Sequence, residues 1–157
     1  MAERLANAYT AQENIGGIEA SSAGTHAVIG HAMHAHAALV LESLGGDSSS
    51  FFARQLTARI ASSADLILTM TRSQREAVLE LSPHQFGKTY SLGEAQQLVT
   101  KCAATSAAEM AASRSALLPE EVLDIPDPIG RDLDIFATVG SQIAQLLFPI
   151  LESFRPE

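Results

Sequence analysis

Residues 65–70 read DLILTM, a short apolar run that is followed at once by the polar sequence TRSQ. Such a run is typical of a strand that is buried on both faces of a parallel sheet. Thr71 and Gln74 have the spacing of a helix-capping box, and Pro83 is a residue at which a helix ends. The sequence therefore predicts a strand over 65–70 that leads directly into a helix over 72–82.

The flanking sequence alternates between helix-like and strand-like segments. Short strands are expected at 18–22, which follows a glycine pair, and more weakly at 89–92. Helical spacing predicts helices over 2–13 and 34–44, a short helix from Leu56-Thr57 to Ala64, and a last helix with the apolar stripe Ile143, Leu146, Leu147, Ile150 and Leu151. Strands that alternate with helices predict an α/β sandwich with a parallel sheet and right-handed crossovers.

The composition indicates one domain, because the chain has 157 residues, of which 46% are hydrophobic and 18% charged. The net charge of −8 argues against binding to nucleic acid or to an anionic membrane. The single cysteine excludes an intramolecular disulfide and a cysteine-rich metal site. No signal peptide opens the sequence, and the apolar stretch at 146–151 is much shorter than the ~20 residues of a membrane span. We expect a soluble, cytoplasmic protein.

Two candidate ligand sites are rejected on chemical grounds. The sequence SPHQFGKT at 82–89 resembles a phosphate-binding Walker A loop, but it follows a helix and precedes a strand, which is the reverse of the required order. Four histidines (His26, His31, His34 and His36) lie close together in the sequence without a carboxylate or cysteine at ligand spacing. No metal site is therefore predicted.

Cys102 lies at the start of an Ala/Ser-rich segment, residues 101–118, which we interpret as an insertion on the surface. A phosphatase nucleophile would need an arginine six positions later to bind the phosphoryl oxygens, and Ala108 stands there. No histidine or arginine beside Cys102 in the sequence would lower the pKa of its thiol. We expect Cys102 to be a structural or incidental thiol.

Asp127 lies between two prolines in the sequence DIPDPIG at residues 124–130, just before the last helix. The prolines stiffen the loop and so fix the orientation of the carboxyl group, which suits a general acid that must reach a leaving group. Asp-Pro is also a common turn that precedes helices, and this interpretation is the better one for the motif taken alone.

Taken together, these segments resemble the low-molecular-weight protein tyrosine phosphatases. The opening sequence MAERL is similar to the first helix of the family, and SAGT at 22–25 is similar to the segment after its second strand. RQLT at 54–57 and DLILTMTRS at 65–73 are similar to the stretches around its third strand. Asp127-Pro128 matches the acid motif of the family, and the resemblance extends over nearly the whole chain outside 101–118.

The resemblance implies an α/β fold of the flavodoxin-like type, a three-layer sandwich with a parallel sheet. The family's first and central strand would lie between 18–22 and 65–70, and it leads into a loop of Cys, five residues and Arg. Both would precede Met1, so we expect 1–157 to be a single, N-terminally incomplete domain with an insertion at about 101–118. An internal start codon, a truncated expression product and a natural degenerate form are all open explanations.

The family also implies a mechanism in two steps. A thiolate attacks the phosphorus of phosphotyrosine while Asp127 protonates the phenolate, and water then hydrolyses the phosphocysteine with Asp127 as base. The resemblance places Thr25 and His26 beside the substrate, and Ile129 stands where the family often has an aromatic residue that flanks the substrate ring. It implies no metal and no cofactor.

The expected partner is a phosphotyrosine protein or a small phosphomonoester, with no nucleic acid and no membrane. Exposed strand edges would favour an oligomer. The chain by itself is expected to be inactive, because the nucleophile loop is absent from it. Two other interpretations are open: a non-catalytic interaction module that lost the loop, and an arsenate reductase, which the single cysteine disfavours.

Overall fold

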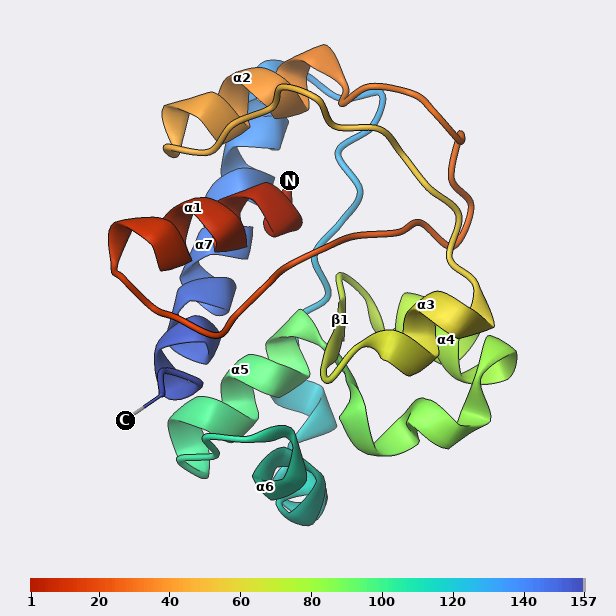
Figure 1. The fold of residues 1–157 in the computed structure, drawn as a ribbon, viewed down its shortest axis with the longest axis vertical. Coiled ribbons are helices and arrows are strands. Elements are labelled where there is room, and N and C mark those ends of the chain that lie inside the picture. The colour runs from red at the N-terminus through yellow and green to blue at the C-terminus, as the bar shows by residue number, and fades with distance from the viewer. Residues whose placement is uncertain (157) are drawn as a thin grey trace.

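The computed structural model describes residues 1–156 and places a small parallel sheet between two groups of helices (Figure 1). The sheet packs against α4 (Arg72–Leu81) on one side and against α5 (Leu92–Lys101) on the other. Beyond α5 lies α7 (Leu133–Ser153), which contacts α1 (Ala2–Gln12) and α2 (Ala35–Ser43). The described chain is therefore an α/β fold, as the alternation of segments predicts.

The sheet consists of β1 (Ile67–Thr69) and β2 (Thr89–Ser91), which run parallel with Ile67 opposite Thr89 and Thr69 opposite Ser91. The three residues of β2 are all buried, whereas two of the three residues of β1 are only half-buried. Both predicted strands in this part of the chain are confirmed, and so is their parallel orientation.

The remaining elements are short. They are α3 (Ala58–Ser63), α6 (Ala107–Ala112) and the 3-10 helices η1 (Pro83–Lys88), η2 (Arg114–Ala116) and η3 (Pro119–Glu121). The predicted helices over 2–13, 34–44, 57–64, 72–82 and the C-terminal segment are confirmed to within a residue or two at the ends that the sequence defined.

The C-terminal helix α7 carries the largest part of the core. Of its predicted stripe, Ile143, Leu147, Ile150 and Leu151 are buried and Leu146 is half-buried. Its end is tied to α1, because Tyr9 stacks on Phe148 with ring centroids 4.0 Å apart. Within residues 1–156, α7 is the one helix that is long and apolar enough to cross a bilayer, but it packs against α1, α2 and α5, as the core helix of a folded domain does.

Local capping explains where the helices around the sheet begin. The Thr71 hydroxyl accepts the Gln74 N–H at 3.1 Å, and the Gln74 side chain accepts the Met70 N–H instead of that of Thr71. The predicted box therefore reaches one residue further back. Ser91 and Glu94 form a complete capping box at the start of α5, a helix that the sequence analysis did not predict.

The predicted strand at 18–22 is wrong. Among the described residues this segment follows an extended path after α1 (Figure 1) but has no strand neighbour. A strand requires a neighbour that satisfies its N–H and C=O groups. The Asn7 amide replaces that neighbour at one residue, where it donates to the Ala20 carbonyl and accepts the Ala20 N–H, both at 3.1 Å. One parallel bridge follows, between Gly24 and Gln55.

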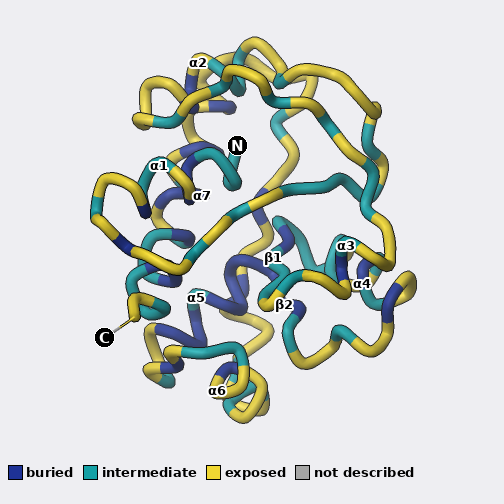
Figure 2. Tube along the Cα trace, viewed as in Figure 1, coloured by how far each residue is buried: buried dark blue, intermediate teal, exposed yellow. Residues whose placement is uncertain are grey.

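The segment 101–118 is packed more tightly than a free surface insertion would be. Met110 in α6 is fully buried and Ala104 nearly so, and both belong to the core cluster that includes α5 and α7 residues. Figure 2 shows the remainder of the segment as mostly exposed. Buried side chains therefore anchor the segment to the domain.

Candidate functional site

The loop that carries Asp127 starts at the carboxyl end of β1, next to the first turn of α4. The Ile125 N–H donates to the Met70 carbonyl at 2.9 Å, and Asp124 accepts from the backbone N–H of Arg72 at 3.0 Å. Ligands of open α/β sheets bind outside the carboxyl ends of the strands. This edge of the sheet is therefore the natural candidate for a site.

Asp127 itself is exposed, and its carboxylate makes one local hydrogen bond, in which Oδ1 accepts the Ile129 N–H at 3.0 Å. The turn continues with the Arg131 N–H donating to the Pro128 carbonyl at 3.0 Å, and α7 begins at Leu133. One carboxylate oxygen is thus oriented by the turn, while the other is left accessible to a ligand.

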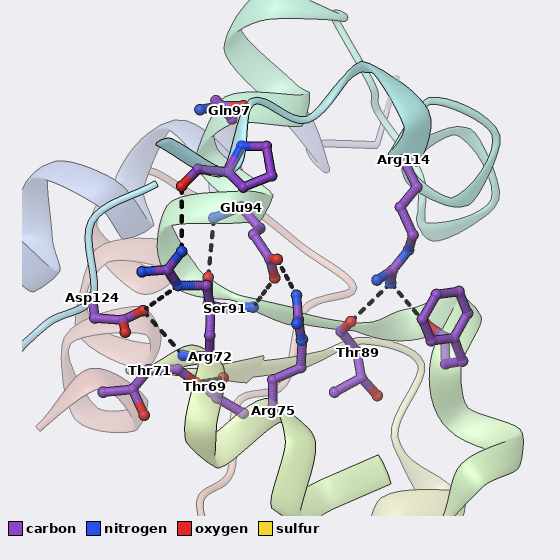
Figure 3. A network of polar contacts seen from close by, with 12 residues as sticks. Thr69, Thr71, Arg72, Arg75, Thr89, Ser91, Glu94, Gln97, Arg114 and Asp124 are labelled. Atoms are coloured by element: carbon purple, nitrogen blue, oxygen red, sulfur yellow. Dashed lines mark hydrogen bonds and ion pairs between the residues drawn. The ribbon is translucent and has the colours of Figure 1, made fainter. Parts of the chain in front are cut away.

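A polar network ties the helices together at the same edge of the sheet (Figure 3). Arg75 of α4 forms an ion pair with Glu94 of α5, and the second carboxylate oxygen of Glu94 accepts the Ser91 N–H at 2.8 Å. Glu94 is nearly buried, so its charge requires these partners. The network fixes α4 against α5 across the ends of both strands.

Arg114 of η2 packs at the other end of β2, where that strand begins. Its guanidinium donates to the carbonyls of Phe86 and Thr89 at 2.6 and 2.8 Å, and it lies 4.1 Å from the ring centroids of Phe86 and Tyr90. Arg75, Glu94 and Arg114 were not predicted from the sequence. The spacing of Ser91 and Glu94 was a readable signal for a capping box, whereas the arginines carry no signature of their own in the sequence.

Thr25 and His26 lie in a different loop, which Gln55 holds in place. The Gln55 amide donates to the Thr25 carbonyl at 2.8 Å and accepts the Ala27 N–H at 3.0 Å. His26 is exposed between these two anchors. Among residues 1–156, no hydrogen bond or ion pair joins this loop to Asp127, so the structure orders both loops but does not link them directly.

Ile129 is 60% exposed beside Asp127 and therefore presents an aliphatic surface next to the carboxylate. Val28, Ile29 and Phe52 are similarly exposed. The last of these lies on the strand-like segment whose Ala53 is hydrogen-bonded to Gly30 and His31. Large exposed apolar side chains thus lie next to the loop that contains Thr25 and His26.

Cys102 and two of the four histidines noted in the sequence contribute to the packing and capping of helices. Cys102 ends α5 and packs in part against the core. His34 caps α2 by accepting the His36 N–H, and both imidazoles pack on Phe136. Within the described chain, no group of three His, Cys, Asp or Glu side chains is arranged to hold a metal ion.

The first turn of α1 is half-buried, and burial lowers the pKa of the Met1 amino group. Met1 occupies the capping position without a side-chain hydrogen bond, and Glu3 lies in the first turn, where its Oε2 accepts from the Ser22 hydroxyl at 2.5 Å. This bond connects α1 to the extended segment that follows it. A helix N-terminus of this kind has free N–H groups that suit an anion.

Comparisons with known proteins agree with this arrangement. The family model described as low molecular weight phosphotyrosine protein phosphatase matches residues 1–103. The low molecular weight protein-tyrosine-phosphatase Ptp of Acinetobacter johnsonii is 34% identical over 88 residues, which are 56% of this chain and 62% of that protein. The probable phosphatase EpsP of Ralstonia nicotianae is 34% identical over 55% of this chain and 59% of its own length. The matches therefore span about three fifths of these relatives.

Solved structures show the same fold over almost the whole chain. Wzb of Vibrio vulnificus, in complex with benzylphosphonate, superposes with a TM-score of 0.71 at 23% identity, over 96% of this chain and 86% of that chain. The YwlE arginine phosphatase of Geobacillus stearothermophilus gives a TM-score of 0.72 at 22% identity, over 96% and 83%. The fold is thus the flavodoxin-like α/β fold that the resemblance implied. Because the family model matches residues 1–103, well over half of this chain, the chain belongs to the low molecular weight phosphotyrosine protein phosphatase family.

Proposed function

We propose that this chain provides the scaffold and the general acid of a cysteine-dependent phosphatase that hydrolyses phosphotyrosine or similar phosphomonoesters. The observation that carries the proposal is the position of Asp127. Its carboxylate is exposed on a loop that is anchored to the carboxyl end of β1 and stiffened by two prolines, in a chain of this family. A general acid has to present a carboxyl group in a fixed direction to a leaving group.

The proposed reaction has two steps. A thiolate sulfur attacks the phosphorus, the bond from phosphorus to the leaving oxygen breaks, and Asp127 donates its proton to that oxygen. Water then attacks the phosphorus of the phosphocysteine, Asp127 accepts a proton from the water, and the phosphorus–sulfur bond breaks to release inorganic phosphate and the thiolate. No metal or cofactor enters either step.

The thiolate is not supplied by Cys102 in this proposal. Cys102 is partly covered at the end of α5, and Ala108 stands where a phosphate-binding arginine would be needed. The proposal therefore requires a loop of Cys, five residues and Arg that this sequence does not contain. The N-terminus of α1 suits the end of such a loop, because the N–H groups and the dipole of a helix N-terminus stabilise a phosphate dianion.

We further propose that a strand leading into this loop pairs with the free edge of β1. Within residues 1–156 the sheet has only two strands, so β1 has a neighbour on one side alone. The segment 18–22 is extended, and its Ala20 packs on the same core cluster as Leu68 of β1. A strand between them would satisfy both backbones, and without it the same edges favour an oligomer.

Thr25, His26 and Ile129 are proposed to border the substrate. Gln55 orders the loop of the first two residues, and Ile129 is bonded through its backbone to Asp127. An aliphatic side chain at this position contacts an aromatic ring without stacking on it, so Ile129 also favours a second candidate substrate that has no ring. One solved structure of similar fold is an arginine phosphatase, which makes phosphoarginine that candidate.

The alternative is an interaction module that does not catalyse. It predicts that no added loop confers hydrolysis, and it shares with the phosphatase the expectation of a cytoplasmic location and of no nucleic-acid or membrane partner. An arsenate reductase would need further cysteines, and the sequence contains one.

The test is hydrolysis of p-nitrophenyl phosphate, phosphotyrosine and phosphoarginine by two proteins. One is the 157-residue chain, and the other, called here the extended protein, carries in front of Met1 an added strand followed by a loop of Cys, five residues and Arg, as the family resemblance implies. We expect activity in the extended protein alone and a loss of about 10²–10⁴-fold in Asp127→Asn, the usual range for general acid–base catalysis. Cys102→Ser is the matched control and should retain full activity. Turnover by the 157-residue chain, or an extended protein that is insensitive to Asp127→Asn, would refute the proposal.

A further inference from the structure

We infer that Asp124 is a positioning residue that holds the Asp127 loop against the first turn of α4. This inference rests on the proposed role of Asp127 as general acid. Nothing in the sequence pattern alone distinguishes Asp124, because it belongs to the same short acidic and proline-containing stretch.

Asp124 contacts the first turn of α4. Its Oδ1 accepts the backbone N–H of Arg72 at 3.0 Å and the Arg72 Nε–H at 3.3 Å (Figure 3). A guanidinium nitrogen of Arg72 also donates to the Pro119 carbonyl at 3.3 Å. Arg72 therefore holds the loop at two points, before and at Asp124.

The backbone between Asp124 and Asp127 has little conformational freedom. Ile125 is 2% exposed, and its N–H donates to the Met70 carbonyl at 2.9 Å. Pro126 follows with a fixed φ angle, and Pro128 follows the acid in turn. A displacement at Asp124 is therefore transmitted to Asp127, because the residues between them offer little torsional freedom.

Catalysis by Asp127 would depend on where its carboxyl group lies relative to the sheet. A general acid has to lie within hydrogen-bonding distance of the leaving oxygen, and a misplacement of about 1 Å costs about 10²-fold in rate. The only hydrogen bond that the Asp127 side chain makes among residues 1–156 is to the Ile129 N–H of its own turn. The turn cannot by itself set its position relative to the sheet, so the anchors at Asp124 and Ile125 have to do so.

The activity test compares Asp124→Ala, Asp124→Asn and Asp127→Asn in the extended protein, alone and combined. We expect Asp124→Ala to lower kcat by about 10–100-fold with little change in KM, because the position of the acid and not the binding of substrate is altered. Asp124→Asn keeps the oxygen that accepts the Arg72 N–H and should restore part of the rate. In the Asp127→Asn background, Asp124→Ala should have almost no further effect, since no acid is left to position.

A matched control is Asp132→Ala, which removes an exposed carboxylate from the same loop, one that makes no capping hydrogen bond to α7. It should leave kcat unchanged. Equal losses from Asp124→Ala in the presence and absence of Asp127 would overturn the inference while the proposed function stands. An extended protein whose rate does not depend on Asp127 would overturn both.

A second measurement uses the 157-residue chain and does not depend on catalytic activity. Amide hydrogen exchange reports three parts of the loop separately: the contact with Asp124 at Arg72, the segment between the two aspartates at Ile125, and the turn of Asp127 at Ile129. We expect Asp124→Ala to accelerate exchange at all three positions and Asp132→Ala to accelerate it at none of them. Unchanged exchange at Ile125 and Ile129 in Asp124→Ala would overturn the inference.

Discussion

Residues 65–101 and residues 14–57 both contain short segments for which the sequence predicts strands, but only the first region forms a sheet. In the first region β1 and β2 pair in parallel, each is followed by a capped helix, and β2 is completely buried. In the second region the backbone at 18–22 is extended and half-exposed, and side chains take the place of a strand neighbour. A short segment therefore becomes a strand only where another backbone can pair with it.

The two regions also differ in how their polar groups are satisfied. Around β2, Glu94 receives both the Arg75 ion pair and the Ser91 N–H in a nearly buried position. Around 18–22, the Arg54 Nε–H donates to the Ser22 carbonyl at 2.7 Å from an exposed side chain. Exposed hydrogen bonds exchange with water and stabilise less than buried ones, so we expect the first region to be the more stable one.

The largest predicted effect is a truncation in the first region. Leu92 is fully buried directly after β2, and Leu92→Ala should lower the free energy of unfolding by about 2–5 kcal/mol, measured by urea denaturation. Its control is Ile18→Ala, which removes a side chain of the same size from the half-buried segment and should cost about 1 kcal/mol. Equal costs at the two positions would show that both regions are packed alike.

An intermediate effect is predicted for Asn7, whose amide makes both backbone hydrogen bonds of Ala20. Asn7→Ala should lower the free energy of unfolding by about 1 kcal/mol and accelerate amide exchange at Ala20. Gln12→Ala is the control, since Gln12 is exposed on the same helix and bonds only its neighbour Glu13. If exchange at Ala20 does not respond to Asn7→Ala, another group must hold the extended segment.

The smallest effect is a dependence on pH at the contact between α1 and α7. The Arg155 guanidinium and the Tyr9 hydroxyl donate to Glu152, which holds the pKa of this carboxyl below its usual range. A depressed folded-state pKa stabilises the fold above the unfolded-state pKa, and this stabilisation is lost as the pH falls through the folded-state value. Melting temperatures measured from neutral to acidic pH should therefore fall less steeply in Glu152→Gln. An identical slope in both proteins would show that Glu152 does not contribute.

Much of the fold could be predicted because local patterns decide it. The apolar run at 65–70, the Thr71 cap and the stripe of α7 each depend on residues close together in the sequence, and the structure confirms them. The strand at 18–22 could not be assessed in this way, since pairing depends on a distant backbone. The helix α5 was not predicted, although the spacing of Ser91 and Glu94 is that of a capping box.

The candidate site shows the same division. Asp127 could be singled out because two prolines flank it, whereas the ion pair of Arg75 with Glu94 joins residues from two helices whose packing is tertiary. The anchor from Arg72 to Asp124 bridges residues far apart in the sequence and could not be predicted for the same reason. Asp127 could thus be singled out from the sequence, but the contacts that hold its loop could not.

The most direct test of the account is residue-resolved amide hydrogen exchange at 18–22, 67–69 and 89–91, in the 157-residue chain and in the extended protein. The account predicts that 18–22 exchanges much faster than β2 in the 157-residue chain, because its backbone has no strand neighbour there. It also predicts that the added strand slows exchange at 18–22 and in β1 while β2 is unchanged. Protection of 18–22 equal to that of β2 without the added strand, or fast exchange at 18–22 in an extended protein that hydrolyses p-nitrophenyl phosphate, would contradict it.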